Sequence, residues 1–97
     1  MPRRITRTVK VGDLLLGHEH PIRVQSMTTT DTRDVAGTAE QIERLVAAGC
    51  ELVRVTVNHD QAADALPELR KRCPVPLVAD IHFTHRLALR AIAAGVD

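Results

Sequence analysis

The sequence predicts an α/β fold built on a parallel β-sheet, and three features of the chain support this prediction. After a short opening hairpin, strand-like and helix-like segments alternate along the chain. The strand-like segments centre on Val24, Val53 and Val78, so they are separated by about 25 to 30 residues, the length of one strand–helix unit. In addition, 44% of the residues are hydrophobic but only 1% are aromatic, and aliphatic side chains fill the core of parallel sheets well. The repeated order predicts right-handed crossovers between parallel strands.

The chain opens with a predicted β-hairpin. Residues 8–11 and 14–16 are rich in Val and Leu, and the pair Gly12-Asp13 between them suits a two-residue type II′ turn. A segment rich in turn-forming residues follows. Residues 22–27 then have the pattern of a strand, and they lead into a polar loop over residues 28–34.

The first helix is predicted from Val35 to Gly49. Apolar residues recur there at helical spacing, and Thr38 with Gln41 has the spacing of a capping box near the helix start. Glycine is a common residue just beyond a helix end. The next segment, residues 51–58, alternates and is rich in β-branched residues, so it is predicted to be a strand.

Two further helices flank the last predicted strand. One covers residues 60–72, and Pro67 is expected to kink or restart it because proline cannot donate a hydrogen bond to the preceding turn. Residues 77–83 form the predicted strand. Thr84 is a suitable N-cap for the last helix, which is expected to end at Gly95.

A short internal sequence repeat is informative about domain organisation. Residues 46–51, with the sequence VAAGCE, lead directly into the second strand, and residues 92–97, with the sequence IAAGVD, have the same layout. We therefore expect the 97 residues to be the front part of a larger barrel or sheet. The alternative is a natural three-stranded domain that ends on an unused turn.

Composition and charge exclude several classes of protein. A chain of 97 residues suffices for one small domain. Its 13 basic and 12 acidic residues leave a net charge of +1, unlike the basic excess of a nucleic-acid-binding protein. No window approaches the roughly 18 apolar residues of a membrane span, and the basic N-terminus lacks the apolar stretch of a signal peptide. We therefore expect a cytoplasmic protein that binds neither nucleic acid nor membranes.

Two local features qualify this picture. The N-terminal segment carries basic residues without any acid, and it is expected to be a solvated arm, with contact to a phosphate or an acidic surface as the alternative. These residues are Arg3, Arg4, Arg7 and Lys10. The two cysteines, Cys50 and Cys73, are not in CxxC spacing and are expected to be reduced and buried.

Candidate functional residues gather where the predicted strands end, which is where parallel α/β proteins bind their ligands. Together they provide a cation, hydroxyls, amides, a carboxylate and an imidazole, a set suited to binding an anion and moving protons. They are Gln25, Ser26 and Thr28–Thr30 after the first strand, Arg54, Thr56 and Asn58 in the second, and Asp80 and His82 in the third.

Arg54 is the most informative of these residues. It stands in mid-strand between valines, so it must face either a buried anion or a carboxylate. A phosphate or diphosphate would accept bidentate hydrogen bonds from it, whereas Asp80 on the next strand is the alternative partner, and the residues alone leave both open.

The remaining candidates also have more than one interpretation. His82 could donate to the same anion, carry a proton, or merely be hydrogen-bonded. Asp80 and His82 have the spacing of a metal pair, but two ligands are too few to indicate a metal site. The threonine run over residues 28–32 could cradle an anion at a helix N-terminus or could serve only as a capping loop.

Three blocks of sequence resemble a known family. They are VQSMTTTDTRD over residues 24–34, AGCELVRV over residues 48–55 and PLVADIHF over residues 76–83. In this order, and after the opening hairpin, they are similar to the amino-terminal part of the 4-hydroxy-3-methylbut-2-enyl diphosphate synthase family, also called GcpE or IspG. The resemblance spans essentially the whole chain.

The resemblance implies a fold and an activity. Members of this family have an amino-terminal TIM-type (β/α)8 barrel and a carboxyl-terminal domain that holds a [4Fe-4S] cluster. Residues 1–97 would then supply the hairpin and the first three βα units, with the iron–sulfur domain absent. The family reductively opens 2-C-methyl-D-erythritol 2,4-cyclodiphosphate in the methylerythritol phosphate pathway of isoprenoid biosynthesis. Ferredoxin or flavodoxin supplies the electrons, and the full-length enzyme is expected to be a homodimer.

The resemblance also implies roles for individual residues. Arg54 and His82 would contact the diphosphate, and Asp80 would support the site. Further residues could lie on the substrate side, namely Gln25, Ser26, Thr28 and Asn58. No catalytic residue and no metal ligand are expected in this chain, because the cluster ligands, three cysteines and a glutamate, are matched by neither of its cysteines. The chain alone is therefore expected to be inactive.

Two alternatives remain open at this point. One is a different phosphate-ligand barrel enzyme, similar to a pterin synthase or an aldolase, which would use Arg54 and His82 without a cluster. The other is a small non-catalytic domain that associates through its open sheet edge.

Overall fold

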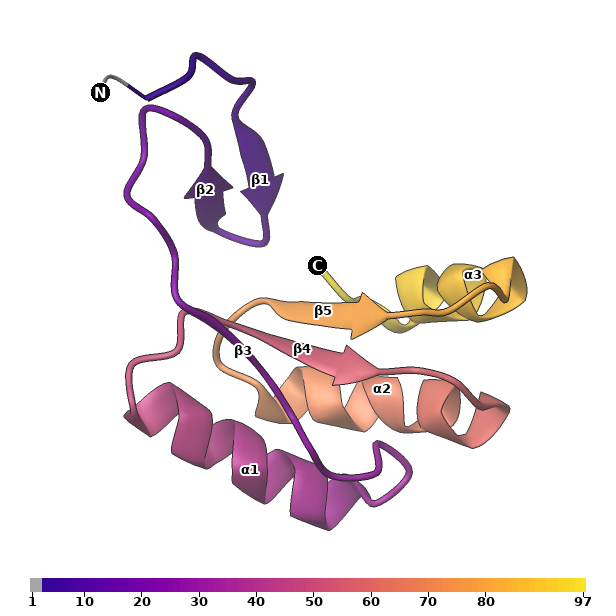
Figure 1. The fold of residues 1–97 in the computed structure, drawn as a ribbon. Coiled ribbons are helices and arrows are strands. Elements are labelled where there is room, and N and C mark those ends of the chain that lie inside the picture. The colour runs from indigo at the N-terminus through magenta and orange to yellow at the C-terminus, as the bar shows by residue number, and fades with distance from the viewer. Residues whose placement is uncertain (1–2) are drawn as a thin grey trace.

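The computed structural model describes residues 3–97 and consists of two sheets and three helices (Figure 1). In chain order the elements are β1 (Val9–Val11), β2 (Leu14–Leu16), β3 (Gln25–Met27), α1 (Val35–Ala47), β4 (Leu52–Thr56), α2 (Asp60–Arg72), β5 (Leu77–Asp80) and α3 (His85–Ala94). Strands β3, β4 and β5 form one sheet in that order, and both pairings are parallel. The predicted α/β class with a parallel sheet is confirmed.

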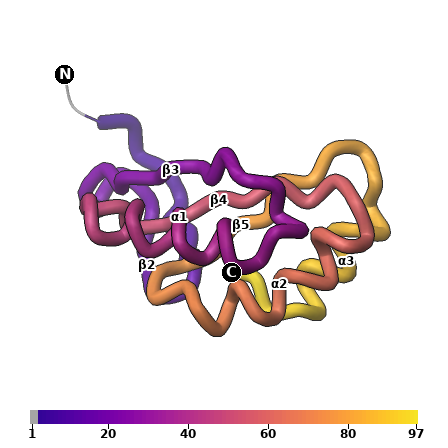
Figure 2. The backbone as a smooth tube through the Cα atoms, turned by 90° about the horizontal axis from the view of Figure 1, so that it is seen from below, coloured from indigo at the N-terminus to yellow at the C-terminus, as the bar shows by residue number. Residues whose placement is uncertain are grey.

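The hydrophobic core lies between this sheet and the helices. Figures 1 and 2 show α1 and α2 together on one side of the sheet. Val53, Val55 and Val57 are fully buried, whereas Arg54 and Thr56 between them are only partly buried. Side chains of a strand alternate between the two faces, so the valines face the helices and the polar residues face away from them. The helices contribute Ile42, Leu66 and Leu69 to the same core.

The hairpin stands at the other side of the sheet from α1 and α2 (Figure 1). Strands β1 and β2 pair antiparallel across Gly12-Asp13. Gly12 has a φ of +58°, and Phe83 is the only non-glycine residue with positive φ among residues 3–97, so Asp13 does not share this conformation. Positive φ at the first central residue alone is the geometry of a type II′ turn. A Cβ at Gly12 would lie 3.0 Å from Cγ of Pro76, so this close approach also favours glycine.

The basic N-terminal arm is attached to the segment after the hairpin through Thr6 and Arg3. The Thr6 hydroxyl accepts from the His18 amide at 3.1 Å. Arg3 donates hydrogen bonds to the carbonyl oxygens of His20 at 2.6 Å and Gly17 at 3.0 Å. Met1 and Pro2, where the predicted solvated arm begins, lie outside the described residues.

Strand β3 is shorter than the strand predicted over residues 22–27. It starts at Gln25 because its partner β4 starts at Leu52, and the register pairs these two residues. Before this point Ile22 and Val24 are exposed. Glu51 connects the residues that precede β3 and β4. Its amide donates to the Val24 carbonyl at 2.8 Å, and its carboxylate accepts from the Val24 amide at 3.1 Å.

Helix α1 is capped by Asp34, so the predicted capping box of Thr38 and Gln41 is wrong. The Asp34 carboxylate accepts from the Gly37 amide at 3.1 Å. Thr38 lies inside the helix, where its hydroxyl is 2.7 Å from that of Thr30 and thus connects the helix to the loop. Gln41 also bonds to the loop rather than to the helix start.

Asp34→Ala is expected to lower the free energy of unfolding by about 1 kcal/mol, because the Gly37 amide loses its acceptor at the helix N-terminus. Chemical denaturation followed by circular dichroism measures this change. Glu40→Ala, an exposed change on the same helix, is the matched control and should have a smaller effect. Equal effects of the two substitutions would contradict the capping role of Asp34.

Helix α2 runs unbroken from Asp60 to Arg72. The predicted restart at Pro67 therefore does not occur. Pro67 is exposed, while Ala62, Ala65 and Leu69 on the opposite side of the helix are buried. The packing of this apolar face outweighs the local preference of proline to end a helix.

Strand β5 ends at Asp80, three residues earlier than predicted. Asp80 pairs with Thr56, the last residue of β4, so no partner remains for the residues that follow. Helix α3 then begins after Thr84, whose side chain makes no capping hydrogen bond, and ends at Gly95 with a φ of +95°. Within the part of the chain that the structure describes, no helix has the length and apolar character needed to cross a membrane.

Candidate functional site

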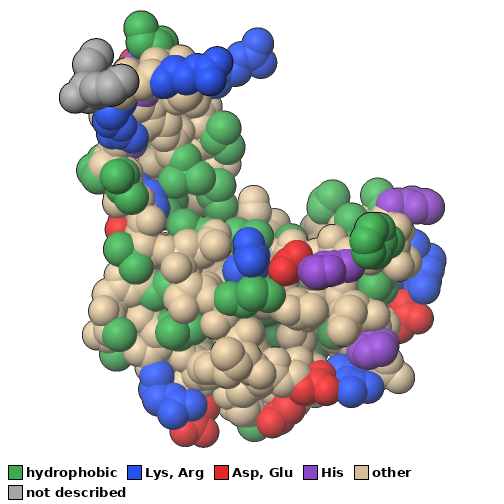
Figure 3. All heavy atoms as spheres, viewed as in Figure 1, with side chains coloured by type: hydrophobic (Ala, Val, Ile, Leu, Met, Phe, Trp, Pro, Cys, Tyr) green, Lys and Arg blue, Asp and Glu red, His purple; other side chains and the backbone are tan. Residues whose placement is uncertain are grey.

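The parallel register places the polar residues of β4 and β5 on the face of the sheet that α1 and α2 do not cover. Met27, Arg54 and Val78 lie in one row across the three strands, and Thr56 and Asp80 lie in the next row. Residues in one row share a face, so Arg54, Thr56 and Asp80 face the same side. Figure 3 shows basic, acidic and histidine side chains close together on this side of the molecule.

Asp80 is the centre of the cluster. Its Oδ1 lies 3.1 Å from Nε2 of His82, and its Oδ2 lies 3.7 Å from Nε of Arg54. His82 belongs to the loop after β5 rather than to the predicted strand, yet its side chain still meets Asp80. The structure therefore brings together the three residues that the sequence pointed to for diphosphate binding.

These contacts do not satisfy all the hydrogen-bond donors of the Arg54 guanidinium. At 3.7 Å its Nε is within ion-pair range of Asp80 but makes no hydrogen bond, and it is one of only two buried side-chain polar atoms without a partner among residues 3–97. One terminal nitrogen, Nη2, lies 3.5 Å from Sδ of Met27, a weak acceptor. The side chain is 40% exposed, so the guanidinium remains open to a ligand. Buried donors normally have partners, so this unpaired nitrogen distinguishes Arg54 from the other charged side chains of residues 3–97.

A threonine-rich loop borders the cluster and is held in place from α1. Gln41 accepts from the amides of Thr29 at 2.8 Å and Thr30 at 3.2 Å, and its own amide donates to the Thr29 hydroxyl at 2.9 Å. Thr32 donates to the Thr56 carbonyl at the end of β4 at 2.6 Å. This clamp of Gln41 on the loop could not be predicted from the sequence, because Gln41 has the spacing of a capping residue and nothing local distinguishes the two uses.

The remaining candidates have different positions. Gln25 is exposed and shares its face with Met27, whereas Ser26 is paired with Val53 and shares the helix-covered face. Thr28 is buried, and its hydroxyl is the second buried polar atom without a partner in residues 3–97. Asn58 is exposed just after β4.

A cleft of about 400 Å³ lies beside the loop at the carboxyl ends of β3 and β4. Asn58, Thr56 and residues 29–33 line it together with His59. On its rim, hydrogen bonds from the Arg33 side chain lower the pKa of Asp31 from 3.8 to about 2, so this carboxylate is ionised throughout the physiological range. The hydroxyls of Thr30 and Thr32 are engaged within the protein, and Arg54, Asp80 and His82 are not among the residues that line this cleft.

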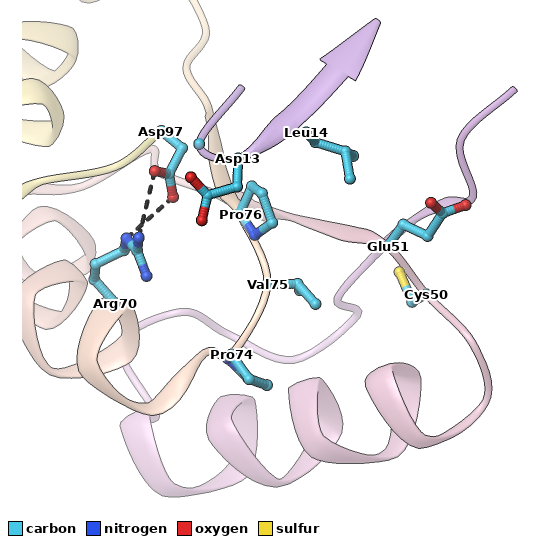
Figure 4. A pocket seen from close by; sticks show the side chains of 10 residues that line it. Asp13, Leu14, Cys50, Glu51, Arg70, Pro74, Val75, Pro76 and Asp97 are labelled. Atoms are coloured by element: carbon cyan, nitrogen blue, oxygen red, sulfur yellow. Dashed lines mark hydrogen bonds and ion pairs between the residues drawn. The ribbon is translucent and has the colours of Figure 1, made fainter. Parts of the chain in front are cut away.

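The opposite end of the sheet contains a second cleft, of about 450 Å³, and both cysteines. Figure 4 shows Arg70 paired with Asp97 at one side of this cleft and Cys50 with Glu51 at the other. The Cys50 thiol donates to the Leu52 carbonyl and the Cys73 thiol to the Val75 carbonyl, and burial raises the pKa of Cys73. Both cysteines therefore have structural positions, and burial favours the protonated form of the Cys73 thiol.

The residues present do not fit an iron–sulfur cluster, which requires four protein ligands, usually thiolates. The chain has two cysteines, both precede strands at the end of the sheet away from Arg54, and both are buried. No group of three or more metal-ligating side chains occurs in residues 3–97.

A parallel sheet with helices on one face and polar side chains gathered toward its carboxyl ends defines an α/β domain of the kind that binds ligands at this edge. The family model that matches, over residues 6–97, is described as the GcpE TIM-barrel domain. The chain belongs to this family.

Individual relatives agree with this assignment. The chain is 58% identical over 95 residues to a protein from Maridesulfovibrio salexigens, and 55% identical over 95 residues to one from Geobacillus thermodenitrificans. Both are named 4-hydroxy-3-methylbut-2-en-1-yl diphosphate synthase (flavodoxin). Each alignment covers 98% of this chain but only 26% and 25% of the two relatives, so the chain spans about a quarter of their length.

Proposed function

We propose that this chain forms the leading part of the diphosphate-binding barrel of a 4-hydroxy-3-methylbut-2-en-1-yl diphosphate synthase. In this proposal the complete enzyme reductively opens the ring of 2-C-methyl-D-erythritol 2,4-cyclodiphosphate in isoprenoid biosynthesis. One observation carries the proposal. The guanidinium of Arg54 lies beside Asp80 and His82, toward the end of the sheet where ligands bind, and its Nε has no hydrogen-bond partner among residues 3–97. The names of the relatives support the same reaction.

The geometry suggests how the site divides its work. Arg54 offers its terminal nitrogens to the diphosphate in a bidentate contact. Asp80 orients both neighbours: its Oδ2 faces Arg54, and its Oδ1 accepts from Nε2 of His82. The cationic form of the imidazole then donates from Nδ1 to the ligand, because both ring nitrogens donate only in that form. In this proposal Gln25, Thr28 and Asn58 make secondary contacts, and Ser26 contributes least, because it shares a face with the core valines.

The barrel itself belongs to the proposal. Residues 1–97 would supply an opening hairpin and three βα units of a (β/α)8 barrel, and the next strand would pair with β5. Asp97 supports this pairing, because its amide donates to the Leu77 carbonyl at 2.9 Å and its carboxylate accepts from the Leu77 amide at 3.1 Å. Glu51 makes the same two contacts with Val24 immediately before β4.

The complete enzyme needs parts that these residues do not provide. We place the [4Fe-4S] cluster, its ligands and the catalytic acid outside this chain. Flavodoxin is the electron donor that the relatives' names favour, with ferredoxin as the alternative. We further propose a cytoplasmic homodimer.

His82→Asn tests the proposed site. In the complete enzyme, turnover at subsaturating substrate should fall by about tenfold to a hundredfold, the loss expected when one hydrogen bond to a charged group is removed. The visible absorbance of the cluster should be unchanged, because His82 lies on the barrel. His85→Asn, an exposed histidine at the start of α3, is the matched control. Full activity of His82→Asn, or activity of the 97-residue chain alone, would contradict the proposal.

A further inference from the structure

The loop after β5 contains a strained turn centred on Phe83. Phe83 has a φ of +66°, and the Thr84 amide donates to the His82 carbonyl at 2.8 Å. A hydrogen bond between residues two apart around a positive φ defines a γ-turn of the rare, strained kind. Bulky residues seldom adopt positive φ because Cβ clashes with the backbone, and such strain concentrates at functional sites.

Burial does not compensate for this strain. The Phe83 side chain is fully exposed, with a relative accessibility of 102%, although it is the only aromatic residue in the chain. Its one aromatic contact among the described residues is with His82: the ring centroids are 6.5 Å apart and the planes meet at 80°. This edge-to-face arrangement is a favourable one for aromatic pairs.

The turn also determines where the histidine lies. β5 ends at Asp80 and α3 begins at His85, so the chain must reverse within four residues. The γ-turn makes this reversal directly after His82, and the imidazole is brought to 3.1 Å from Asp80. His82 itself is 61% exposed, so neighbouring packing alone does not fix its ring.

We propose that Phe83 is a positioning residue for the diphosphate site. Its ring holds the imidazole of His82 against Asp80, so that the Nδ1–H of the cationic ring is presented to the ligand. This inference rests on the proposed function, because it assigns Phe83 a role only through the contact that His82 makes with the substrate.

A double-mutant cycle in the complete enzyme tests the inference. The variants are Phe83→Ala, Phe83→Tyr, His82→Asn and the double variant Phe83→Ala/His82→Asn. The measured quantity is the Kd of 2-C-methyl-D-erythritol 2,4-cyclodiphosphate by titration calorimetry. Phe83→Ala should raise Kd by about two- to tenfold, the range that corresponds to one aromatic edge-to-face pair. Phe83→Tyr keeps the ring and should bind like the wild type. Phe83→Ala should have no further effect in the His82→Asn background.

The outcomes separate the inference from the proposed function. An unchanged Kd in Phe83→Ala alongside a raised Kd in His82→Asn would overturn the inference and leave the proposed function intact. An equal effect of Phe83→Ala in both backgrounds would also overturn it, because the ring would then act independently of His82. An unchanged Kd in both single variants would refute the proposed site itself. Phe83→Leu repeats the test with bulk retained, and thermal melting of each variant identifies any loss of folding.

Discussion

Replacing Arg54 with alanine is expected to weaken binding of the cyclic diphosphate to the complete enzyme by about 2 to 5 kcal/mol, a rise in Kd of about thirtyfold to several thousandfold. The guanidinium is partly buried beside Asp80, and its Nε has no hydrogen-bond partner within residues 3–97. A bound diphosphate would complete its hydrogen bonds, so the alanine variant loses both the charge and the planar donor set. In addition, the carboxylate of Asp80 would be left facing the anion without its cation.

Two further variants sharpen this experiment. Arg54→Lys keeps the charge but not the bidentate geometry, so its affinity should fall between those of the wild type and Arg54→Ala. Arg44→Ala removes an exposed arginine from α1, on the other side of the sheet, and should bind normally. Titration calorimetry measures all four proteins. If Arg54→Ala binds substrate as the wild type does, Arg54 forms a structural pair with Asp80 and the anion site lies elsewhere.

Leu66→Ala is expected to lower the free energy of unfolding by about 2 to 5 kcal/mol, the usual cost of truncating a fully buried leucine. Leu66 is 0% exposed and belongs to the cluster that joins α2 to the valines of β4. The loss combines the transfer free energy of the removed methyl groups with the cavity that remains. Because β4 carries Arg54, loosening this layer also disturbs the register on which the site depends.

Denaturant unfolding followed by circular dichroism measures the effect of Leu66→Ala. Glu68→Ala, on the exposed side of the same helix, is the matched control and should change stability by no more than about 0.5 kcal/mol. A similar loss for the two variants would mean that α2 does not pack against the sheet through Leu66.

The predictions that held were those that rest on periodicity. Val53, Val55 and Val57 alternate with polar residues, and this spacing alone places them on the buried face. The order of strands and helices follows in the same way from the change between a period of two and a period of about 3.6. Even the position of Arg54 opposite the core valines can be read from the residue numbers.

The predictions that failed concern the ends of elements. Asp34, Thr38 and Gln41 are all suitable capping residues, and the local sequence does not rank them. Contacts with the loop leave Asp34 as the cap, because the side chains of Thr38 and Gln41 are hydrogen-bonded to Thr30 and Thr29. Similarly, β5 stops at Asp80 because β4 offers no further partner, although residues 77–83 keep a strand-like pattern.

The alternation of residue types is local, so the sequence itself specifies which side chains face the core and which face the opposite side of the sheet. Distances between segments are not local. The 3.1 Å contact of His82 with Asp80, the clamp of Gln41 on the threonine loop and the missing partner of Arg54 depend on strand register and on the turn at Phe83. Register and turn geometry arise from the packing of all the elements together, so only the tertiary structure could assemble the candidate residues into a site.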